Sequence, residues 1–297
     1  MPVALVFPGQ GSQRPGMGAA WRDSPAWALV EHASRVAGRD LGHLLLDADA
    51  EELRQTANAQ LATFLTSVLA LHAVRERLAE VDAYAGHSLG EVTALVAAGV
   101  LAPADGVRVV AERGAAMQEA ADARPGTMAA VLGLDDDAVA HVVDGVDDAW
   151  LANHNAPAHV VVSGTPDGVQ RAGEALKAAG ARRVLALPVG GAFHTPLMAP
   201  AQDRLDAALQ SAAWHDRGGT VLSAVTAAPY EGDWPDLLSR QLTAPVRWRQ
   251  TVQALVDRGV DTVVEVGPGG VLTGLVTRCA PGVRAISVAT PADLEAL

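Results

Sequence analysis

The apolar positions in the first third of the chain follow strand-like and helix-like spacing in turn. Residues 3–7 form a short apolar run that ends at Pro8-Gly9, which predicts a buried strand entering a loop. A long helix is predicted over 61–78, where apolar residues recur at Leu61, Leu65, Val68, Leu71, Val74 and Leu78. A strand is then predicted over 81–85, and helices over 91–98 and 104–119.

The pattern changes near Arg124. The elements predicted after it are a strand over 127–134, a helix over 136–143, strands over 150–153 and 159–163, a helix over 166–179 and a strand over 183–188. This β-α-β-β-α-β order is the ferredoxin-like pattern. We therefore expect a small ferredoxin-like subdomain over 125–189, inserted into a large subdomain made of residues 1–124 and 190–297.

Helices and strands alternate again after this insertion. The predicted elements are helices over 197–209, 234–241 and 247–257 and strands over 220–225 and 262–266. Alternation of helices with buried strands indicates a mainly parallel sheet. The predicted fold class is α/β, with a large α/β-hydrolase-like subdomain around a mainly parallel sheet and the smaller inserted one.

The strongest local signal for chemistry is Gly86-His87-Ser88-Leu89-Gly90, which fits G-x-S-x-G. It stands between a predicted strand and a predicted helix, the context that this motif requires. Its glycines allow the tight turn that exposes the serine hydroxyl, and the following helix N-terminus favours negative charge on an acyl oxygen. Ser88 is therefore the candidate nucleophile, with a Gly/Ser turn that performs no chemistry as the alternative.

A serine nucleophile needs a neighbouring base, and the chain has nine histidines. His194 stands out because it lies in a glycine-rich loop, 190–196, after the last strand of the insertion, and such loops often form active sites. The loop Gly9-Gln10-Gly11 follows the first strand and has amides for an oxyanion or a phosphate. It fits neither a Walker loop nor G-x-G-x-x-G, so phosphate is the weaker interpretation.

The composition is that of an ordinary globular protein: 49% of the 297 residues are hydrophobic and 19% are charged. A net charge of -12 disfavours nucleic acid and anionic lipid. Cys279 is the only cysteine, which excludes an internal disulfide and indicates a reducing, cytoplasmic location. Residues 1–7 lack a signal-peptide pattern, and glycines and prolines interrupt the charge-free stretch 184–202, so no membrane span is expected. No metal-ligand spacing is present, and no metal is expected.

Four motifs, in their order along the chain, resemble one family closely. They are Phe7-Pro8-Gly9-Gln10-Gly11-Ser12-Gln13, Gly86-His87-Ser88-Leu89-Gly90-Glu91, Ala192-Phe193-His194-Thr195-Pro196-Leu197-Met198 and Glu265-Val266-Gly267-Pro268-Gly269. They resemble malonyl-CoA:acyl-carrier-protein transacylases and, equally, the acyltransferase domains of polyketide synthases. The segments 108–118 and 153–164 are also similar, and the resemblance runs from residue 3 to about residue 290.

The resemblance implies a role for each matching residue. Ser88 would be acylated, and His194 would be its general base and acid, oriented by a backbone carbonyl near 245–247. The backbone amides of Gln10 and Leu89 would form the oxyanion hole. Arg113 would bind the free carboxylate of malonyl, because a guanidinium offers a carboxylate two parallel hydrogen bonds.

The implied reaction moves a malonyl-type group from coenzyme A to an acyl-carrier protein. Coenzyme A enters as a thioester substrate, no tightly bound cofactor is expected, and the protein is expected to be a monomer. Phe193 precedes the histidine as in malonyl-selective polyketide relatives, where a bulky ring would exclude an α-methyl branch.

Three alternative functions stay open at this level. An α/β-hydrolase shares G-x-S-x-G, but its histidine usually lies near the C-terminus, whereas no histidine follows His215 here. An acyl-carrier thioesterase or a carrier-to-carrier acyl shuttle would keep the fold and change the reaction. A catalytically inactive binding module would not need Ser88 and His194 together.

Overall fold

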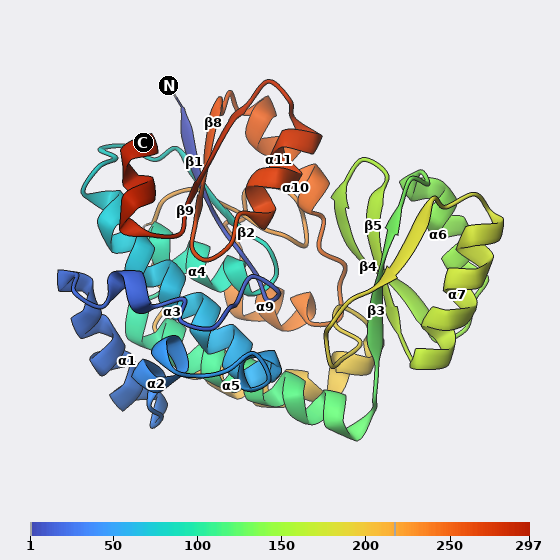
Figure 1. The fold of residues 1–297 in the computed structure, drawn as a ribbon, viewed down its shortest axis with the longest axis horizontal. Helices are drawn as coiled ribbons and strands as arrows, with labels where there is room; N and C mark the ends of the chain where they lie inside the picture. Colours follow the sequence, from blue (N-terminus) through green and yellow to red (C-terminus); the bar gives the residue numbers. More distant parts are fainter. Residues whose placement is uncertain (1, 217) are drawn as a thin grey trace.

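The computed structural model describes every residue except Met1 and Arg217, and it contains two β-sheets. The larger sheet lies among most of the helices, and the smaller one lies at one end of the molecule with its own two helices (Figure 1). This confirms the predicted fold class: an α/β body with a parallel sheet and a separate antiparallel sheet.

The larger sheet has five parallel strands in the order β7-β2-β1-β8-β9. These are β1 Val3–Phe7, β2 Ala83–Gly86, β7 Val221–Leu222, β8 Thr262–Val266 and β9 Arg284–Val288. Side chains alternate across the sheet, so Leu5 and Phe7 pack on one face and Ala4 and Val6 on the other. Both faces are covered by helices, as the apolar runs of β1 and β8 require.

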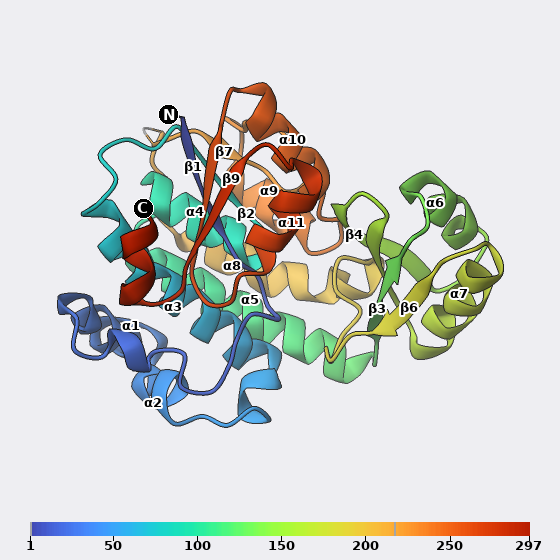
Figure 2. The same ribbon diagram turned by 45° about the horizontal axis from the view of Figure 1, so that its top comes forward.

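Helices α3, α4 and α5 pack on the Leu5 face, and α10 and α11 pack on the opposite face (Figure 2). The helices of this part are α1 Ala28–Ala37, α2 Leu41–Leu46, α3 Thr56–Arg75, α4 Leu89–Ala98, α5 Pro103–Ala123, α8 Gln202–Ser211, α9 Trp234–Gln241, α10 Trp248–Asp257 and α11 Val271–Cys279. Short 3-10 helices lie at Ala19–Trp21, Pro25–Trp27, Glu52–Arg54, Pro196–Ala201 and Pro291–Ala296.

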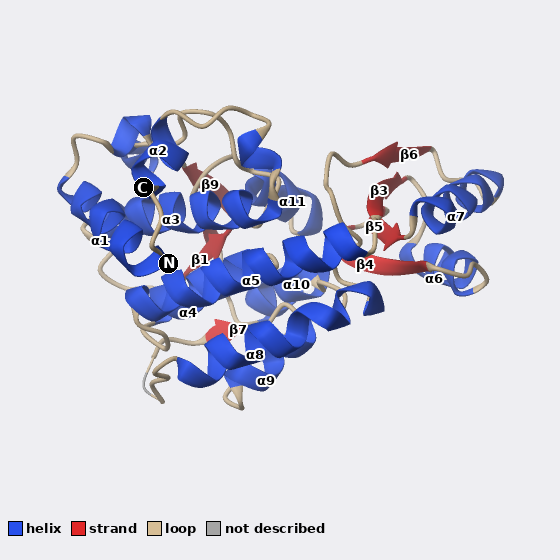
Figure 3. Ribbon diagram, turned by 90° about the horizontal axis from the view of Figure 1, so that it is seen from below, coloured by secondary structure: helices blue, strands red, loops and turns tan. Residues whose placement is uncertain are grey.

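The smaller sheet is antiparallel and has the strand order β4-β5-β3-β6. Its elements, in chain order, are β3 Thr127–Leu132, α6 Asp136–Asp144, β4 Ala149–Ala156, β5 His159–Gly164, α7 Pro166–Ala178 and β6 Arg183–Ala186. Both helices lie on one face of this sheet (Figure 3). The predicted ferredoxin-like order is confirmed, while the boundaries at 124/125 and 189/190 stay a prediction.

Strand β4 forms backbone hydrogen bonds to the segment between α9 and α10, which belongs to the large subdomain. The amide of His154 donates to the carbonyl of Val246 at 2.8 Å, and the amide of Val246 donates to the carbonyl of Ala152 at 2.8 Å. This junction fixes the segment before α10 against the small sheet.

Several sequence predictions were wrong in extent. The helix expected over 61–78 is α3, which begins at Thr56 and ends at Arg75, and the strand expected over 150–153 is the longer β4. The helix expected over 197–209 begins as a 3-10 helix, because Pro196 and Pro200 interrupt regular α-helical hydrogen bonding. The strand expected over 220–225 is reduced to β7, two residues at the sheet edge. Helices α1, α2 and α11 and strand β9 lie where no element had been predicted.

Helix α3 is long and apolar enough, by length and composition, to cross a membrane. Buried residues make up 83% of its most apolar window, because it packs between the sheet and α5. Burial of this kind is typical of a core helix.

Candidate active site

Ser88 lies in a sharp turn between β2 and α4 and has a strained backbone, with φ 53° and ψ -111°. The turn closes tightly because its glycines lack side chains. A Cβ on Gly86 would lie 1.9 Å from the carbonyl carbon of Gly90, and one on Gly90 would lie 2.0 Å from the carbonyl oxygen of Phe7. The G-x-S-x-G spacing therefore brings the serine hydroxyl out of the turn.

The structure brings His194 to Ser88, across 106 residues of chain, with 2.8 Å between Ser88 Oγ and His194 Nε2. The other ring nitrogen, Nδ1, lies 3.0 Å from the carbonyl oxygen of Gln241 and 3.1 Å from that of Ala244. Because carbonyls only accept, Nδ1 carries the proton and Nε2 is free to accept one from the serine. The orienting carbonyls thus belong to Gln241 and Ala244, which lie just before the stretch near 245–247 that the resemblance had implied.

The imidazole of His194 is neutral. Burial lowers its pKa to about 3, and the nearby positive charge of Arg113 acts in the same direction. The two carbonyl contacts act the other way, because they stabilise the protonated ring. A neutral ring can act as a base, and a negative charge bound at Arg113 would raise its basicity.

The side chain of Arg113 extends from α5 to the hydroxyl of Ser88 and is only 2% exposed. Its Nη1 donates to Gln60 Oε1 at 2.8 Å, and its Nη2 donates to Ser88 Oγ at 3.1 Å and to Gln241 Oε1 at 2.9 Å. Its Nε has no hydrogen-bond partner among the described residues. Burial lowers the pKa of this guanidinium to about 10, so it stays protonated.

Two residues of the site, Glu91 and Gln241, were missed by sequence reasoning. Both are fully buried, and Gln241 Nε2 donates to the Glu91 carboxyl and, at 3.1 Å, to the Ser88 carbonyl oxygen. Burial raises the pKa of Glu91 to about 7. Glu91 directly follows the serine motif, and a charged residue inside an otherwise apolar helix was the signal available for it.

The amides expected to form an oxyanion hole lie on two sides of the serine turn. Leu89 is the first residue of α4, and Gln10 belongs to the loop after β1, where a Cβ on Gly9 would lie 2.6 Å from the His87 carbonyl oxygen. Within residues 2–216 and 218–297, neither amide has a hydrogen-bond acceptor. Both are therefore available to a negatively charged oxygen.

A cavity of about 500 Å³ opens between the two sheets, next to the serine turn. Gln10 and His87 line it together with Asn153 and Asn155 of β4 and Leu272 of α11. His87 is the neighbouring histidine, but its Nε2 lies 2.9 Å from Asn155 Oδ1, and burial lowers its pKa. His87 therefore forms part of the cavity wall, whereas His194 contacts the serine.

Phe193 is buried, with 5% exposure, in the apolar core. Its ring packs against Gly191, where a Cβ would lie 2.6 Å from Phe193 Cε1. The described residues that line the cavity do not include it. The ring therefore supports the loop that holds His194, and its role in substrate choice stays a prediction.

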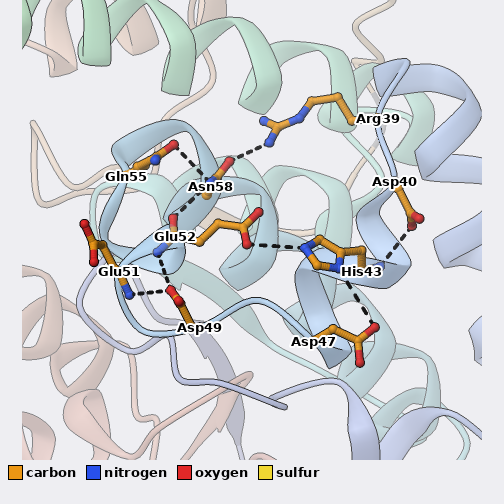
Figure 4. Close-up of polar contacts among 9 residues, drawn as sticks. All are labelled: Arg39, Asp40, His43, Asp47, Asp49, Glu51, Glu52, Gln55 and Asn58. Atoms are coloured by element: carbon orange, nitrogen blue, oxygen red, sulfur yellow. Dashed lines mark hydrogen bonds and ion pairs between the residues drawn. The ribbon is translucent and has the colours of Figure 1, made fainter.

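One wall of the cavity, residues 50–54, is held by a local polar network (Figure 4). Asp49 Oδ1 accepts from the amides of Glu51 and Glu52 at 2.9 and 2.8 Å. His43 Nε2 lies 3.3 Å from Glu52 Oε2, and Asn58 Nδ2 donates to the Glu52 carbonyl at 2.9 Å. This network fixes the wall relative to α2 and α3.

Comparison with known proteins gives a consistent result. The model of the acyl transferase domain family matches residues 4–292. The chain is 40% identical over 301 residues to the malonyl CoA-acyl carrier protein transacylase of Bacillus subtilis, covering 99% of this chain and 95% of that protein.

Solved structures agree with the sequence match. The malonyl-CoA:acyl carrier protein transacylase of Xanthomonas oryzae pv. oryzae superposes with a TM-score of 0.95 at 38% identity, covering 100% of this chain and 98% of that one. A malonyl-transacylase in complex with its type II polyketide synthase acyl-carrier protein superposes with a TM-score of 0.95 at 37% identity, covering 99% of this chain and 98% of that one.

Proposed function

The chain belongs to the acyl transferase domain family, and we propose that this acyltransferase moves a malonyl group from coenzyme A to the phosphopantetheine thiol of an acyl-carrier protein. The relatives named for this reaction cover nearly the whole chain, and one similar structure holds such a carrier. The observation that carries the malonyl assignment is the position of Arg113, whose buried guanidinium lies 3.1 Å from the nucleophilic oxygen.

In the first half-reaction, Ser88 Oγ attacks the thioester carbonyl and His194 Nε2 takes the serine proton. The resulting oxyanion would accept hydrogen bonds from the amides of Gln10 and Leu89, each worth about 3 kcal/mol in comparable sites. The carbon–sulfur bond then breaks, His194 returns the proton to the coenzyme A sulfur, and malonyl-Ser88 remains.

In the second half-reaction, the carrier thiol replaces coenzyme A in the same site. His194 takes the thiol proton, the sulfur attacks the Ser88 ester, and the proton returns to Ser88 Oγ as the ester bond breaks. Because the two thiols use the same site in turn, the kinetics are of the ping-pong type.

Arg113 links substrate choice to the base. A malonyl carboxylate bound at Arg113 would accept a hydrogen bond from Nε, which has no partner among the described residues. The buried cation would then gain a counter-charge. The same carboxylate would offset the effect by which Arg113 lowers the pKa of His194. The base would therefore strengthen when an acyl group with a free carboxylate is bound.

The alternative on this fold is an acyl-carrier thioesterase or a carrier-to-carrier acyl shuttle. A thioesterase would pass the acyl group from Ser88 to water, and a shuttle would accept the acyl group from a carrier in place of coenzyme A. The buried cation argues against substrates that lack a free carboxylate.

The test is incubation with labelled malonyl-CoA, with and without holo-acyl-carrier protein, followed by mass spectrometry of the intact protein. We expect a malonyl adduct on Ser88 that moves to the carrier, and no adduct on Ser88→Ala. A full adduct on Ser88→Ala would refute the nucleophile. Release of free malonate in place of transfer would support the thioesterase.

We also propose that the protein acts as a cytoplasmic monomer without a tightly bound cofactor, metal, nucleic acid or membrane. Its net charge of -12 disfavours nucleic acid and anionic membranes, and its single cysteine suits a reducing compartment. Sedimentation equilibrium of the purified chain tests the monomer.

A further inference from the structure

The side chain of Gln241 lies between the carboxyl group of Glu91 and the guanidinium of Arg113. Its Nε2 donates to Glu91 Oε2 and to the Ser88 carbonyl oxygen, and its Oε1 accepts from Arg113 Nη2 at 2.9 Å. Glu91 and Gln241 are both 0% exposed, so water cannot replace any of these partners. The orientation of one amide group therefore connects three residues around the nucleophile.

Glu91 determines that orientation because both of its oxygens face donors. Its Oε1 accepts from the amide of Ala224 at 3.0 Å, and its Oε2 accepts from Gln241. An ionised carboxylate only accepts, so it satisfies both donors. If the Gln241 amide were turned over, its NH2 group would face the Arg113 donor and its oxygen would face the Ser88 carbonyl.

Gln241 also separates Glu91 from Arg113. Among the described residues, no carboxylate forms an ion pair with Arg113, whose acceptors are an amide, the serine hydroxyl and a second amide. A carboxylate in direct contact would occupy the guanidinium that a substrate carboxylate must reach. With Gln241 in between, the negative charge of Glu91 is close enough to stabilise the guanidinium of Arg113. Glu91 does not itself bind the guanidinium, which can therefore bind a substrate carboxylate.

We propose that Glu91 is a positioning residue which, through Gln241, holds Arg113 ready for a substrate carboxylate and so sets the preference for acyl groups that carry one. This rests on the proposed malonyl transfer. Glu91 touches no reacting atom, and its effect is on substrate binding more than on the chemical step.

The experiment compares Glu91→Gln and Gln241→Met with wild type at pH 8, using malonyl-CoA and acetyl-CoA. The amide introduced by Glu91→Gln would have one acceptor for two donors, and the thioether introduced by Gln241→Met would break the connection without adding a charge. We expect either change to raise the KM for malonyl-CoA about tenfold and to change kcat less than about twofold, as for loss of a hydrogen bond to a charged group. The KM for acetyl-CoA should not change.

Thr93→Val is the matched control. Thr93 is fully buried on the same helix as Glu91, and its hydroxyl has no hydrogen-bond partner among the described residues, so its kinetics should equal those of wild type.

The pH profile separates positioning from a purely structural role. Burial raises the pKa of Glu91 to about 7, while hydrogen bonds from Gln241, from the amide of Ala224 and from the side chain of Ser223, and then the charge of Arg113, lower it. Arg113 is the charged group that acts on Glu91, while burial lowers the pKa of His194 to about 3 and also lowers the pKa of His87. A protonated Glu91 has a donor where an acceptor is needed, so the wild-type KM for malonyl-CoA should rise as the pH falls from 8 to 6. In Glu91→Gln it should be constant.

The outcomes are distinct. If wild type is not acylated by malonyl-CoA, the proposed function fails. If wild type is acylated but Glu91→Gln and Gln241→Met keep its KM and its malonyl preference, the positioning role is overturned. If Glu91→Gln does not fold, Gln241→Met and the wild-type pH profile decide in the same way.

Discussion

Ser88 and His194 both hold left-handed backbone conformations, with φ of 53° and 61°, and their side chains meet at 2.8 Å. Such conformations are unfavourable for non-glycine residues by about 1–3 kcal/mol and persist only where the surrounding structure enforces them. For Ser88 the enforcement comes from the close approach of Gly86 and Gly90, and the side chain of His194 is held by the two carbonyls that contact Nδ1. Two of the five non-glycine residues with positive φ in the described part of the chain are therefore the pair whose contact creates the nucleophile.

Replacing His194 by alanine should slow acylation of Ser88 by about 100-fold or more, because the general base is lost. Single-turnover transfer from malonyl-CoA measures this rate. His72→Ala, an exposed change on α3, is the control and should behave as wild type. Normal transfer by a folded His194→Ala protein would identify another base, with His87 the next histidine to test.

Replacing Arg113 should change substrate preference more than overall chemistry. Arg113→Ala should lower kcat/KM for malonyl-CoA by about tenfold to more than a hundredfold, the loss expected for one partner of a charged hydrogen bond. Arg113→Lys should recover only part of it, because an ammonium cannot form the two parallel bonds of a guanidinium. Equal use of acetyl-CoA and malonyl-CoA by wild type, unchanged in Arg113→Ala, would exclude the carboxylate contact.

Replacing Phe193 tests whether the bulk of its ring excludes an α-methyl branch on the acyl group. Phe193→Ser should raise the use of methylmalonyl-CoA relative to malonyl-CoA, and it should cost about 3 kcal/mol of stability because a buried ring is removed. Phe193→Leu keeps most of the volume and is the control. Kinetics with both thioesters and urea denaturation give the two readouts. An unchanged ratio in Phe193→Ser would place the limit elsewhere.

The pH dependence of acylation should reflect the low pKa of His194. Burial and the charge of Arg113 lower that pKa to about 3, so the ring stays neutral under mildly acidic conditions. A bound malonyl carboxylate offsets the charge of Arg113, but burial is the larger cause and remains. At saturating malonyl-CoA, the acylation rate should therefore be constant from about pH 8 to about pH 5, whereas an ordinary histidine would protonate near about pH 6.5. A fall centred near that ordinary value would contradict a buried neutral base.

The lowered pKa of His194 also makes the stability of the fold depend on pH. Between about pH 6.5 and the folded pKa of about 3, the unfolded chain binds a proton on this histidine and the folded chain does not, so stability falls as the pH falls. Urea midpoints at pH 7.5 and pH 5 should therefore differ more for wild type than for His194→Gln, which has no group to protonate. Equal differences in the two proteins would contradict the low pKa.

Local patterns in the sequence determined most of the fold class. The apolar run of β1 and the helical spacing of apolar residues in α3 indicate a buried strand and a buried helix. The β-α-β-β-α-β order predicts the antiparallel sheet. The motif around Ser88 was also readable, because a tight strand–turn–helix needs glycines at fixed positions. Strand β9 and helix α11 were not readable, because their short apolar patterns are ambiguous until neighbouring strands pair with them.

Tertiary structure alone decided how the site is assembled. Ser88, Arg113, His194 and Gln241 come from four separate segments, and no periodicity relates positions so far apart in the chain. The carbonyls that orient His194 lie at 241 and 244 because the chain turns after α9, which side-chain patterns do not encode. The role of Gln241, and its contact with Glu91, could be recognised only once the fold had buried the two residues together, because a buried polar group must find its hydrogen-bond partners within the protein.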